Sequence, residues 1–589
     1  MLPANAGAGV PPARPVSILT IVALTLGGLL LAVLGVTSLV VMLANAERVH
    51  AAEMAKVAIA LTAAFLSLID ALVVALRRSV PNPVKIVFGV LLAGAAVTAY
   101  FDGFSFSYPN YYHRWDMYHG FLGSKYYPEL GAYKLYRCTL VAQDELGTVT
   151  VPGSDGSPVT VDMTAEARAS TRKIRDLERS RILAPASIAL ENPEACKDAF
   201  EEERWDAFKR DVAFFRGQAG RRYFEDMQTD HGYKASPMWT VGARLVTGLH
   251  APTVGYMKLL SFLDLAFLLG VFGALWWAFG WRVSATGAIF WGCQACSTFY
   301  WTGGAFMRHE WLFFLVLSVC LLRRHHAKLA GASLAYAALL SGFPALVGVG
   351  WVLFGVVQSI RTRRLPREVK GALLGAALCL AVAVPASVLA TSSSAWEATW
   401  ETHVTDATPV TNDMGLGVVL SHGYGDEPGV GRMKYSKDTS LFDPFANWRK
   451  MREERYDAML PGLVVIVLAV ALAFGLAMWR VRSMWIAGAL GQVFIVLLTQ
   501  MVCWNYPFLV LGAALTRLRR WLEVLLFAFA AVTQLAAVGF YYIDDRYTAM
   551  SIVTTLFTVL LVVLLVRVRL TPAKRVRARQ ETEDPGQAW

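Results

Sequence analysis

Long apolar runs separated by short polar connections dominate the hydropathy pattern of the chain. A membrane-crossing helix needs roughly 20 apolar residues, and most of the runs approach that length although several are shorter or interrupted. The runs cover residues 16–43, 54–76, 86–101, 256–279, 286–303, 310–322, 328–342, 344–360, 371–391, 459–478, 484–503, 505–516, 521–542 and 547–566. This pattern predicts an all-α polytopic membrane protein with about 14 transmembrane helices.

The basic residues orient these predicted helices. When the runs are threaded alternately across the membrane, every basic cluster falls on one side, and the positive-inside rule assigns that side, with both termini, to the cytoplasm. The clusters are Arg77 and Arg78, Arg282, Arg323 and Arg324, residues 361–370, Arg480 and Arg482, residues 517–520 and residues 567–579. Two long polar segments then lie on the opposite, extracytoplasmic face: residues 102–255, the first outer loop, and residues 392–457, the second outer loop.

The first outer loop is expected to contain its own small α/β insert. The aromatic stretch 108–136 predicts one or two helices at the membrane surface, where tyrosine and tryptophan suit the headgroup level. Residues 147–162 alternate valine with turn-forming residues, which predicts a hairpin. Residues 163–181 and 193–215 are expected to form charged helices.

This threading divides the chain into five parts. They are a two-helix N-terminal membrane extension (1–84), a membrane core that includes the first outer loop (85–391), the second outer loop (392–457), C-terminal membrane helices (458–570) and a cytoplasmic basic tail (571–589).

Composition agrees with a membrane protein and argues against nucleic-acid binding. The chain has 589 residues, of which 56% are apolar and 17% charged, and its mean hydropathy is +0.44. The net charge of +11 is what basic cytoplasmic loops contribute to a polytopic protein. High alanine, arginine and valine usage suggests a GC-rich bacterial source and hence the bacterial inner membrane. Cys138 and Cys196 both lie in the first outer loop, where an oxidising compartment would permit one disulfide.

The segment His113 to His119 is the first candidate for chemistry. On a helix His113, Asp116 and His119 share a face, so Asp116 has the position of a general base or of a group that orients a histidine. The same spacing is compatible with a divalent metal. The alternative interpretation is an amphipathic helix that faces water or lipid headgroups.

A second candidate is the turn that contains Gly303, Gly304 and Arg308. The glycines allow a close backbone approach, and the planar guanidinium matches phosphate oxygens, so a phosphate site is one interpretation. An interfacial turn with a snorkelling arginine is the other. Asp264 lies inside an apolar run and is a candidate because intramembrane acids are costly, although contact with interfacial water or a neighbouring arginine is the preferred interpretation.

Polar and aromatic residues of the second outer loop suit a sugar or another polar ligand, or an ordinary structural lid. They include Trp396, Trp400, His403, Asn412 and His422. Breaks in the apolar pattern at residues 504–507 and 343–344 predict interrupted helices.

The order of these features resembles the GT-C superfamily of membrane glycosyltransferases, and especially its polyprenol-phosphate-mannose-dependent mannosyltransferase branch. The resemblance rests on an outer-loop Asp116 followed by Tyr118, Gly131 and Leu135-Tyr136, on the Gly303-Gly304 turn with Arg308, and on residues 340–344. It spans roughly residues 85–545. The chain departs from the superfamily pattern in having two spans before the expected first helix and a long insert over residues 147–250.

The resemblance implies an enzyme that transfers a sugar, such as mannose, with inversion from a polyprenyl-phosphate donor to a lipid, glycan or protein acceptor. Asp116 is then the leading catalytic base. Asp102 is the reserve, because it directly follows the apolar run 86–101, the expected first helix of the superfamily, and many members place an acid at that position. Donor phosphate binding is expected from Arg308, His309 and His403. Substrate contacts are expected from His113, His119, Tyr118, Lys125, Asn412 and Trp400. No metal is required, although His113 and His119 remain compatible with a divalent ion.

The sequence is also compatible with two other classes of protein. A polytopic transporter or flippase of lipid-linked substrates would use broken helices and Asp264 along a transport path. A noncatalytic scaffold would bind a partner protein through the outer insert. Polar groups concentrate in the outer loops and outer helix ends, which favours the glycosyltransferase over the transporter.

Overall fold

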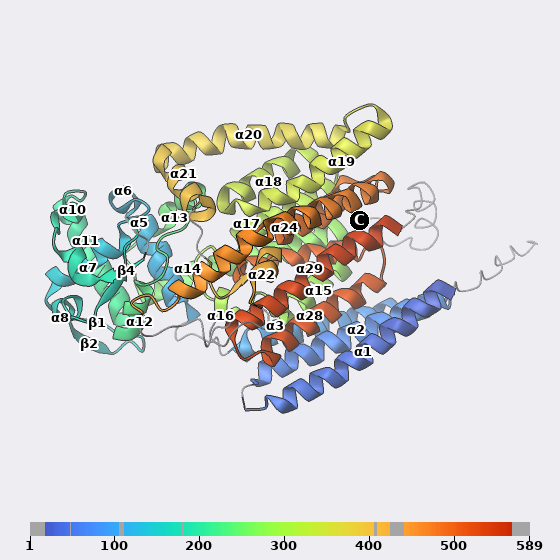
Figure 1. Ribbon diagram of the computed structural model, residues 1–589, viewed down its shortest axis with the longest axis horizontal. Helices are drawn as coiled ribbons and strands as arrows, with labels where there is room; N and C mark the ends of the chain where they lie inside the picture. Colours follow the sequence, from blue (N-terminus) through green and yellow to red (C-terminus); the bar gives the residue numbers. More distant parts are fainter. Residues whose placement is uncertain are drawn as a thin grey trace, which may run out of the picture.

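The computed structural model describes residues 18–47, 49–104, 111–178, 182–405, 409–423 and 441–567. In these ranges it consists mainly of a long helical bundle that carries a smaller polar domain at one end (Figure 1). Nine of the described helices are long and apolar enough to cross a membrane. The predicted all-α, multi-pass membrane protein is therefore confirmed. The expected basic tail, residues 571–589, lies outside the described ranges.

The bundle combines long helices with shorter buried ones. The long helices are α1 (Ile18–Ala44), α2 (Ala51–Ala75), α3 (Asn82–Tyr100), α14 (Val254–Phe279), α19 (Val347–Thr362) with the preceding η4 (Phe343–Leu346), α20 (Arg367–Ala390), α24 (Ala446–Arg480), α28 (Trp521–Gly539) and α29 (Ile543–Arg567). The shorter ones are α15 (Trp281–Cys293), α17 (Glu310–Arg323), α18 (Ala327–Ser341), α25 (Met484–Leu490), α26 (Gln492–Leu498), η6 (Cys503–Val510) and α27 (Leu511–Leu515). The predicted breaks are present, since η4 and η6 are 3-10 segments that contain Pro344 and Pro507.

An ion-pair network joins the N-terminal helices to the rest of the bundle. Arg282 donates from Nη1 to Asp70 at 2.8 Å and binds both oxygens of Glu523 at 2.7 Å. Lys85 also pairs with Asp70, at 3.0 Å. Because Asp70 and Glu523 are buried, each requires such a cationic partner. Helices α1 and α2 are thus part of the bundle, packed against α28.

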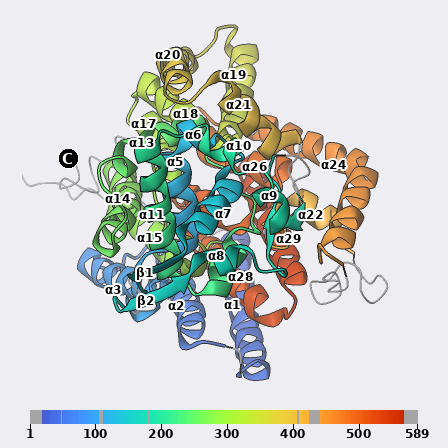
Figure 2. The same cartoon turned by 90° about the vertical axis from the view of Figure 1, so that its left-hand side faces the viewer.

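The outer domain, residues 111–249, covers the end of the bundle that faces the viewer in Figure 2, with α7 and α11 near its middle. Its elements are α4 (Arg114–Met117), η3 (Tyr118–Leu122), α5 (Gly123–Lys125), α6 (Tyr127–Leu130), α7 (Leu135–Leu146), β1 (Thr148–Pro152), β2 (Pro158–Asp162), α8 (Met163–Ala167), β3 (Lys173–Arg175), β4 (Leu183–Pro185), α9 (Ala186–Leu190), α10 (Glu194–Lys197), α11 (Glu202–Gln218), α12 (Arg221–Met227) and α13 (Pro237–Thr247). The expected hairpin is present as the antiparallel pair β1 and β2.

Two expectations for this domain need correction. The aromatic stretch does not form surface helices, because Tyr118, Phe121 and Tyr126 are fully buried and pack in the domain core with α11. Its first residues, 108–110, lie outside the described ranges. Of the charged helix expected over 163–181, residues 179–181 lie outside the described ranges, and the rest is helical only in α8, which β3 follows, paired with β4. Aromatic richness alone does not distinguish a membrane interface from a core, since rings suit both.

The connections outside the domain and the bundle are short. They are η1 (Asp102–Phe104), α16 (Phe299–Thr302), α21 (Ser393–Trp400), η5 (Glu401–Thr405), β5 (Asp413–Met414), α22 (Leu416–Ser421) and β6 (Met501–Val502). Antiparallel pairing of β5 with β6 places the second outer loop against the start of η6.

A disulfide between Cys138 of α7 and Cys196 of α10 closes a loop of 58 residues in the outer domain. Closure of a loop of this length is worth about 4 kcal/mol in the chain-entropy treatment. We expect the double substitution Cys138→Ser/Cys196→Ser to lower the unfolding temperature of the domain, as measured by thermal unfolding in detergent. Substitution of the unpaired Cys379→Ser is the control, and equal unfolding temperatures for the two variants would contradict the assignment.

Candidate functional site

Asp116 and Arg308, the two residues central to the sequence interpretation, are in direct contact. Asp116 lies in α4 of the outer domain, and Arg308 lies in the connection between α16 and α17. Nη2 of Arg308 donates to Oδ1 of Asp116, and the side chains remain 20% and 19% exposed, respectively. Two segments far apart in the sequence thus form one polar site that is still open to solvent, at the boundary between the outer domain and the bundle.

The turn over residues 303–309 is held against the outer domain by backbone contacts. The Phe306 N–H donates to Oδ2 of Asp116 at 2.9 Å, so both carboxylate oxygens are engaged. The His113 N–H donates to the Gly304 carbonyl at 2.7 Å. Gly304 has φ +64° and lies against the backbone of residues 111–113, which leaves no room for a side chain. The glycine therefore permits close packing of the outer domain on this turn.

The charges at the site are defined by burial and by this pairing. Burial alone would raise the pKa of Asp116, but the Arg308 guanidinium and the Phe306 N–H outweigh it and hold that pKa below its usual value. Burial lowers the pKa of His113 to about 4, despite the opposing effect of Asp116. His113 is therefore neutral at pH 7, and its Nδ1 accepts a hydrogen bond from the Asp116 N–H at 3.0 Å.

A second carboxylate holds the other end of the same turn. Asp264 of α14 accepts from the His309 N–H and from His309 Nδ1, both at 2.7 Å. Both residues are buried, at 4% and 1% exposure. The partner of this intramembrane acid is thus a histidine, where interfacial water or an arginine was expected. Between them, Asp116 and Asp264 fix the two ends of the segment that carries Arg308.

A small pocket lies on the bundle side of this turn, among the end of α3, α14 and α16. Its cavity volume is about 10 Å³, which is room for roughly one water molecule. Polar side chains in its lining include Tyr100, Tyr111, Asp264, Thr302 and His309.

An aromatic platform lies beside Arg308. The guanidinium is 5.4 Å from the centre of the Trp504 ring, in cation–π geometry. Trp504 packs against Trp301 at 5.5 Å between ring centres, and Trp301 Nε1 donates to the Tyr547 hydroxyl at 2.8 Å. The helix break expected at Trp504 therefore brings an indole ring to the cation.

Three other predicted substrate-binding residues have structural partners within the outer domain. His119 bonds the Trp115 carbonyl through Nδ1 at 2.8 Å and the Tyr136 hydroxyl through Nε2 at 2.7 Å. The Tyr118 hydroxyl donates to Thr139 at 3.1 Å, and Lys125 pairs with buried Asp211 at 2.6 Å. These contacts stabilise the domain that presents Asp116.

The remaining predicted residues lie elsewhere. Asp102 begins η1, at the end of α3, as an electrostatic neighbour of Lys56 in α2. Trp400 and His403 are exposed, and in the described ranges neither makes a hydrogen bond or ion pair with Asp116 or Arg308. The expected convergence of His403 on this pair is therefore not found. Asn412 is buried and donates to Cys503, the residue before Trp504, at 3.7 Å between Nδ2 and Sγ.

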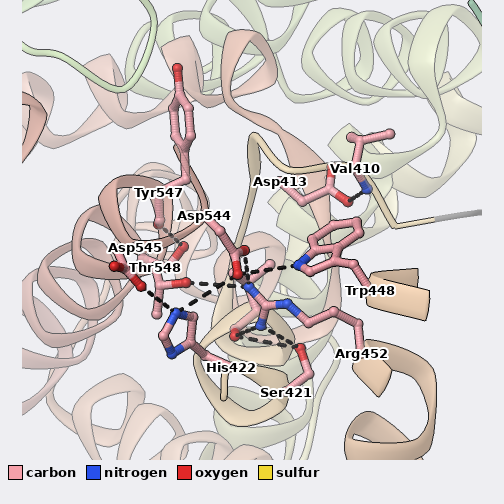
Figure 3. Close-up of polar contacts among 12 residues, drawn as sticks. Val410, Asp413, Ser421, His422, Trp448, Arg452, Asp544, Asp545, Tyr547 and Thr548 are labelled. Atoms are coloured by element: carbon pink, nitrogen blue, oxygen red, sulfur yellow. Dashed lines mark hydrogen bonds and ion pairs between the residues drawn. The ribbon is translucent and has the colours of Figure 1, made fainter. Parts of the chain in front are cut away.

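A buried polar cluster at the outer end of α29 was not predicted (Figure 3). Arg452 of α24 pairs with Asp544 of α29 and donates to the Val418 carbonyl at 2.9 Å. His422 bonds Asp545 through Nε2 at 2.9 Å. The acidic pair at the start of the last apolar run was the available sequence signal, but its partner Arg452 lies 92 residues away. This cluster joins the second outer loop to the bundle.

Neither a metal-ligand cluster nor a similarity to known proteins identifies the chemistry of this site. In the part of the chain that the structure describes, no group of three or more His, Cys, Asp or Glu side chains is placed to hold a metal ion. Comparison of the chain with protein-family profiles, curated proteins and solved structures gives no match. The functional interpretation consequently rests on residues and contacts.

The buried Arg452 pair yields a stability prediction. We expect Arg452→Ala to lower the free energy of unfolding by about 3–5 kcal/mol, because it leaves the buried Asp544 carboxylate without its cation. Thermal unfolding of the purified protein measures the effect. Lys450→Ala, on the same helix but 77% exposed, is the control and should unfold as the wild type does. Equal destabilisation by both variants would contradict this role.

Proposed function

We propose that the protein is a GT-C-like membrane glycosyltransferase that moves a sugar, such as mannose, from a polyprenyl-phosphate donor to a lipid, glycan or protein acceptor. The single observation that carries the proposal is the meeting of Asp116 with Arg308 at the solvent-open boundary of bundle and outer domain. A carboxylate and a guanidinium are the two charges that inverting transfer from a phosphate requires.

The proposal includes a topology of 14 membrane passages in the bacterial inner membrane, with both termini cytoplasmic. It is supported by the nine long apolar helices among the described residues and by the shorter apolar ones between them (Figure 1). The arginine clusters of the sequence, all on one side when the apolar runs are threaded alternately, support it as well. The Cys138–Cys196 disulfide favours an oxidising compartment for the outer domain. The active face is then extracytoplasmic.

Transfer begins when the donor phosphate competes with Asp116 for the Arg308 guanidinium. As long as the ion pair is intact, Arg308 holds the pKa of Asp116 low and makes it a weak base. When phosphate takes over the cation, the pKa of Asp116 rises and the carboxylate becomes able to accept a proton. Donor binding thus activates the base, and it leaves the guanidinium on the group that will depart.

The acceptor hydroxyl then attacks the anomeric carbon from the face opposite the phosphate. Its proton passes to Asp116, a C–O bond to the acceptor forms, and the bond from the anomeric carbon to the phosphate oxygen breaks. The phosphate leaves with the electron pair, and Arg308 stabilises its growing negative charge. Trp504 offers an indole face beside the cation on which a sugar ring can pack. No step of this scheme requires a metal, and the scheme is compatible with a divalent ion.

The base assignment predicts that Asp116→Asn lowers glycoside formation by about 100-fold or more, because the amide cannot accept the proton. The measurement is transfer of labelled sugar from polyprenyl-phosphate mannose in membranes that contain the variant. Donor binding should persist, since the substitution removes the competing carboxylate. Asp155→Asn, at the exposed tip of the β1–β2 hairpin, is the matched control. Full activity of Asp116→Asn would exclude Asp116 as the base and direct attention to Asp102.

The phosphate assignment predicts that Arg308→Ala loses about 100-fold or more in turnover, through lost stabilisation of the leaving group, and also binds the donor more weakly. Steady-state kinetics over a range of donor concentration separates the two effects. Arg308→Lys should recover part of the activity, because it keeps the charge without the planar fork. Arg168→Ala, an exposed arginine of the outer domain, is the control. Unchanged donor affinity and turnover in Arg308→Ala would refute the assignment.

A further inference from the structure

Three arginines converge at the end of the bundle that is remote from the outer domain. Helix α14 leaves the outer domain at Val254, and its 26 residues carry the chain about 39 Å away from it. Arg324 lies at that far end, because its Nε donates to the Trp277 carbonyl of α14 at 3.0 Å. Arg323 is the last residue of α17, and its electrostatic neighbours are Arg324 and Arg517. Arg517 follows α27, so the three guanidinium groups come from two separate segments of the chain.

No carboxylate of the described residues compensates this group of charges. In those ranges neither Arg323 nor Arg517 pairs with an acid, and Nε of Arg323 is buried without a hydrogen-bond partner. Glu368 of α20 reaches neighbouring residues instead: it accepts from the Met484 N–H at 3.4 Å and pairs with His325 at 3.7 Å. The donors of Arg323 and Arg517 are therefore available to a ligand.

Arg282, also at this end of α14, provides a comparison within the same protein. Its guanidinium pairs with Asp70 at 2.8 Å and with Glu523 at 2.7 Å. Two acids from two other helices thus compensate one buried arginine. Cations that lie together beside an apolar bilayer repel one another and lose hydration, so three of them without an acid attract an anion from outside the chain.

Aromatic rings place the three arginines at the level of lipid headgroups. Trp276 and Trp277, in the last turn of α14, are 65% and 43% exposed, and exposed tryptophan is typical of the membrane interface. The guanidinium of Arg324 is 5.2 Å from the centre of the Trp277 ring, and that of Arg323 is 5.8 Å from the centre of the Trp485 ring. The anion at this level is a headgroup phosphate, whose oxygens match the planar donor fork of a guanidinium.

We propose that Arg323, Arg324 and Arg517 bind the headgroup phosphate of an anionic phospholipid, such as phosphatidylglycerol, in the leaflet opposite the outer domain. The bound phosphate neutralises the repulsion between the end of α17 and the segment that follows α27. Basic sites between membrane helices on the cytoplasmic side are suited to such headgroups. The name of the leaflet rests on the proposed topology, whereas the site is independent of the chemistry at Asp116.

Titration of phosphatidylglycerol into the purified full-length protein in detergent, followed by native mass spectrometry, measures the affinity. Arg517→Ala should weaken binding about fivefold, the contribution of one arginine near an anionic lipid, and Arg323→Ala/Arg517→Ala about twentyfold or more. The matched control is Arg361→Ala/Arg480→Ala, which also removes two arginines. Their guanidinium groups already donate to the carbonyls of Trp479 and Val566, at 2.8 and 2.7 Å. The control should bind the lipid as the wild type does.

Thermal unfolding of the same preparations separates lipid binding from a structural role of Arg517. Without lipid, Arg517→Ala should unfold at the wild-type temperature or above it, because the substitution removes a repelling charge. Phosphatidylglycerol should raise the unfolding temperature of the wild type more than that of the variant. A lower unfolding temperature without lipid, together with unchanged lipid affinity, would show that Arg517 is structural and overturn the proposal.

Competing ligands identify what the site recognises. Phosphatidylcholine should bind far more weakly than phosphatidylglycerol, and inorganic phosphate and glycerol 3-phosphate should compete poorly. Equal binding of phosphatidylcholine would indicate general lipid contact, and effective competition by either soluble phosphate would indicate a free-anion site. Equal losses in the two double variants would indicate attraction to total charge. Each of these results would overturn the proposal. None of the measurements uses glycoside formation, so failure here and failure of the transferase proposal are distinguishable.

Discussion

The ion pair between Asp116 and Arg308 is the interaction on which the proposed chemistry depends. It joins a helix of the first outer loop to a turn between two membrane helices, and the Phe306 N–H completes the carboxylate's partners. Because both charges lie close to apolar helices, removing one of them by substitution would leave the other without its partner. The same pair remains partly exposed, which allows a phosphate to exchange with the carboxylate. The same two side chains therefore connect the outer domain to the bundle and carry the proposed chemistry.

The helical, multi-pass character of the chain was predictable from the sequence, because long apolar runs report directly on the bilayer. The breaks at Pro344 and Pro507 and the hairpin at residues 147–162 were also predictable, since proline and turn residues act locally. The interior of the outer domain was not. Tyr118 and Lys125 carry side chains typical of a binding site, yet their environment is set by Thr139 and by Asp211, which a distant part of the chain supplies.

The candidate site was predictable only in part, for the same physical reason. Asp116 and Arg308 were recognisable as candidates from their local sequence context, and Asp264 was recognisable as an acid that is costly in an apolar run. Their pairing was not, because Asp116 with Arg308 and Asp264 with His309 each join separate elements. His403 could bind a phosphate, but it lies on η5, where its side chain is exposed at the surface. The ion pair of Arg452 with Asp544 (Figure 3) could not be predicted either, because the two residues come from different helices. Local sequence patterns identify polar side chains that need a partner, whereas the fold determines which of them come into contact.

The most direct test of the central claim uses purified protein in proteoliposomes supplied with candidate lipid, glycan and protein acceptors and with polyprenyl-phosphate mannose that carries label in the sugar. A glycosyltransferase at the extracytoplasmic face converts the label into a new glycoside on the side that the outer domain occupies, and releases polyprenyl phosphate in equal amount. That product is the result the account predicts. Label that crosses the bilayer on chemically unchanged donor, with no glycoside formed on either side, would identify a transporter and contradict the account.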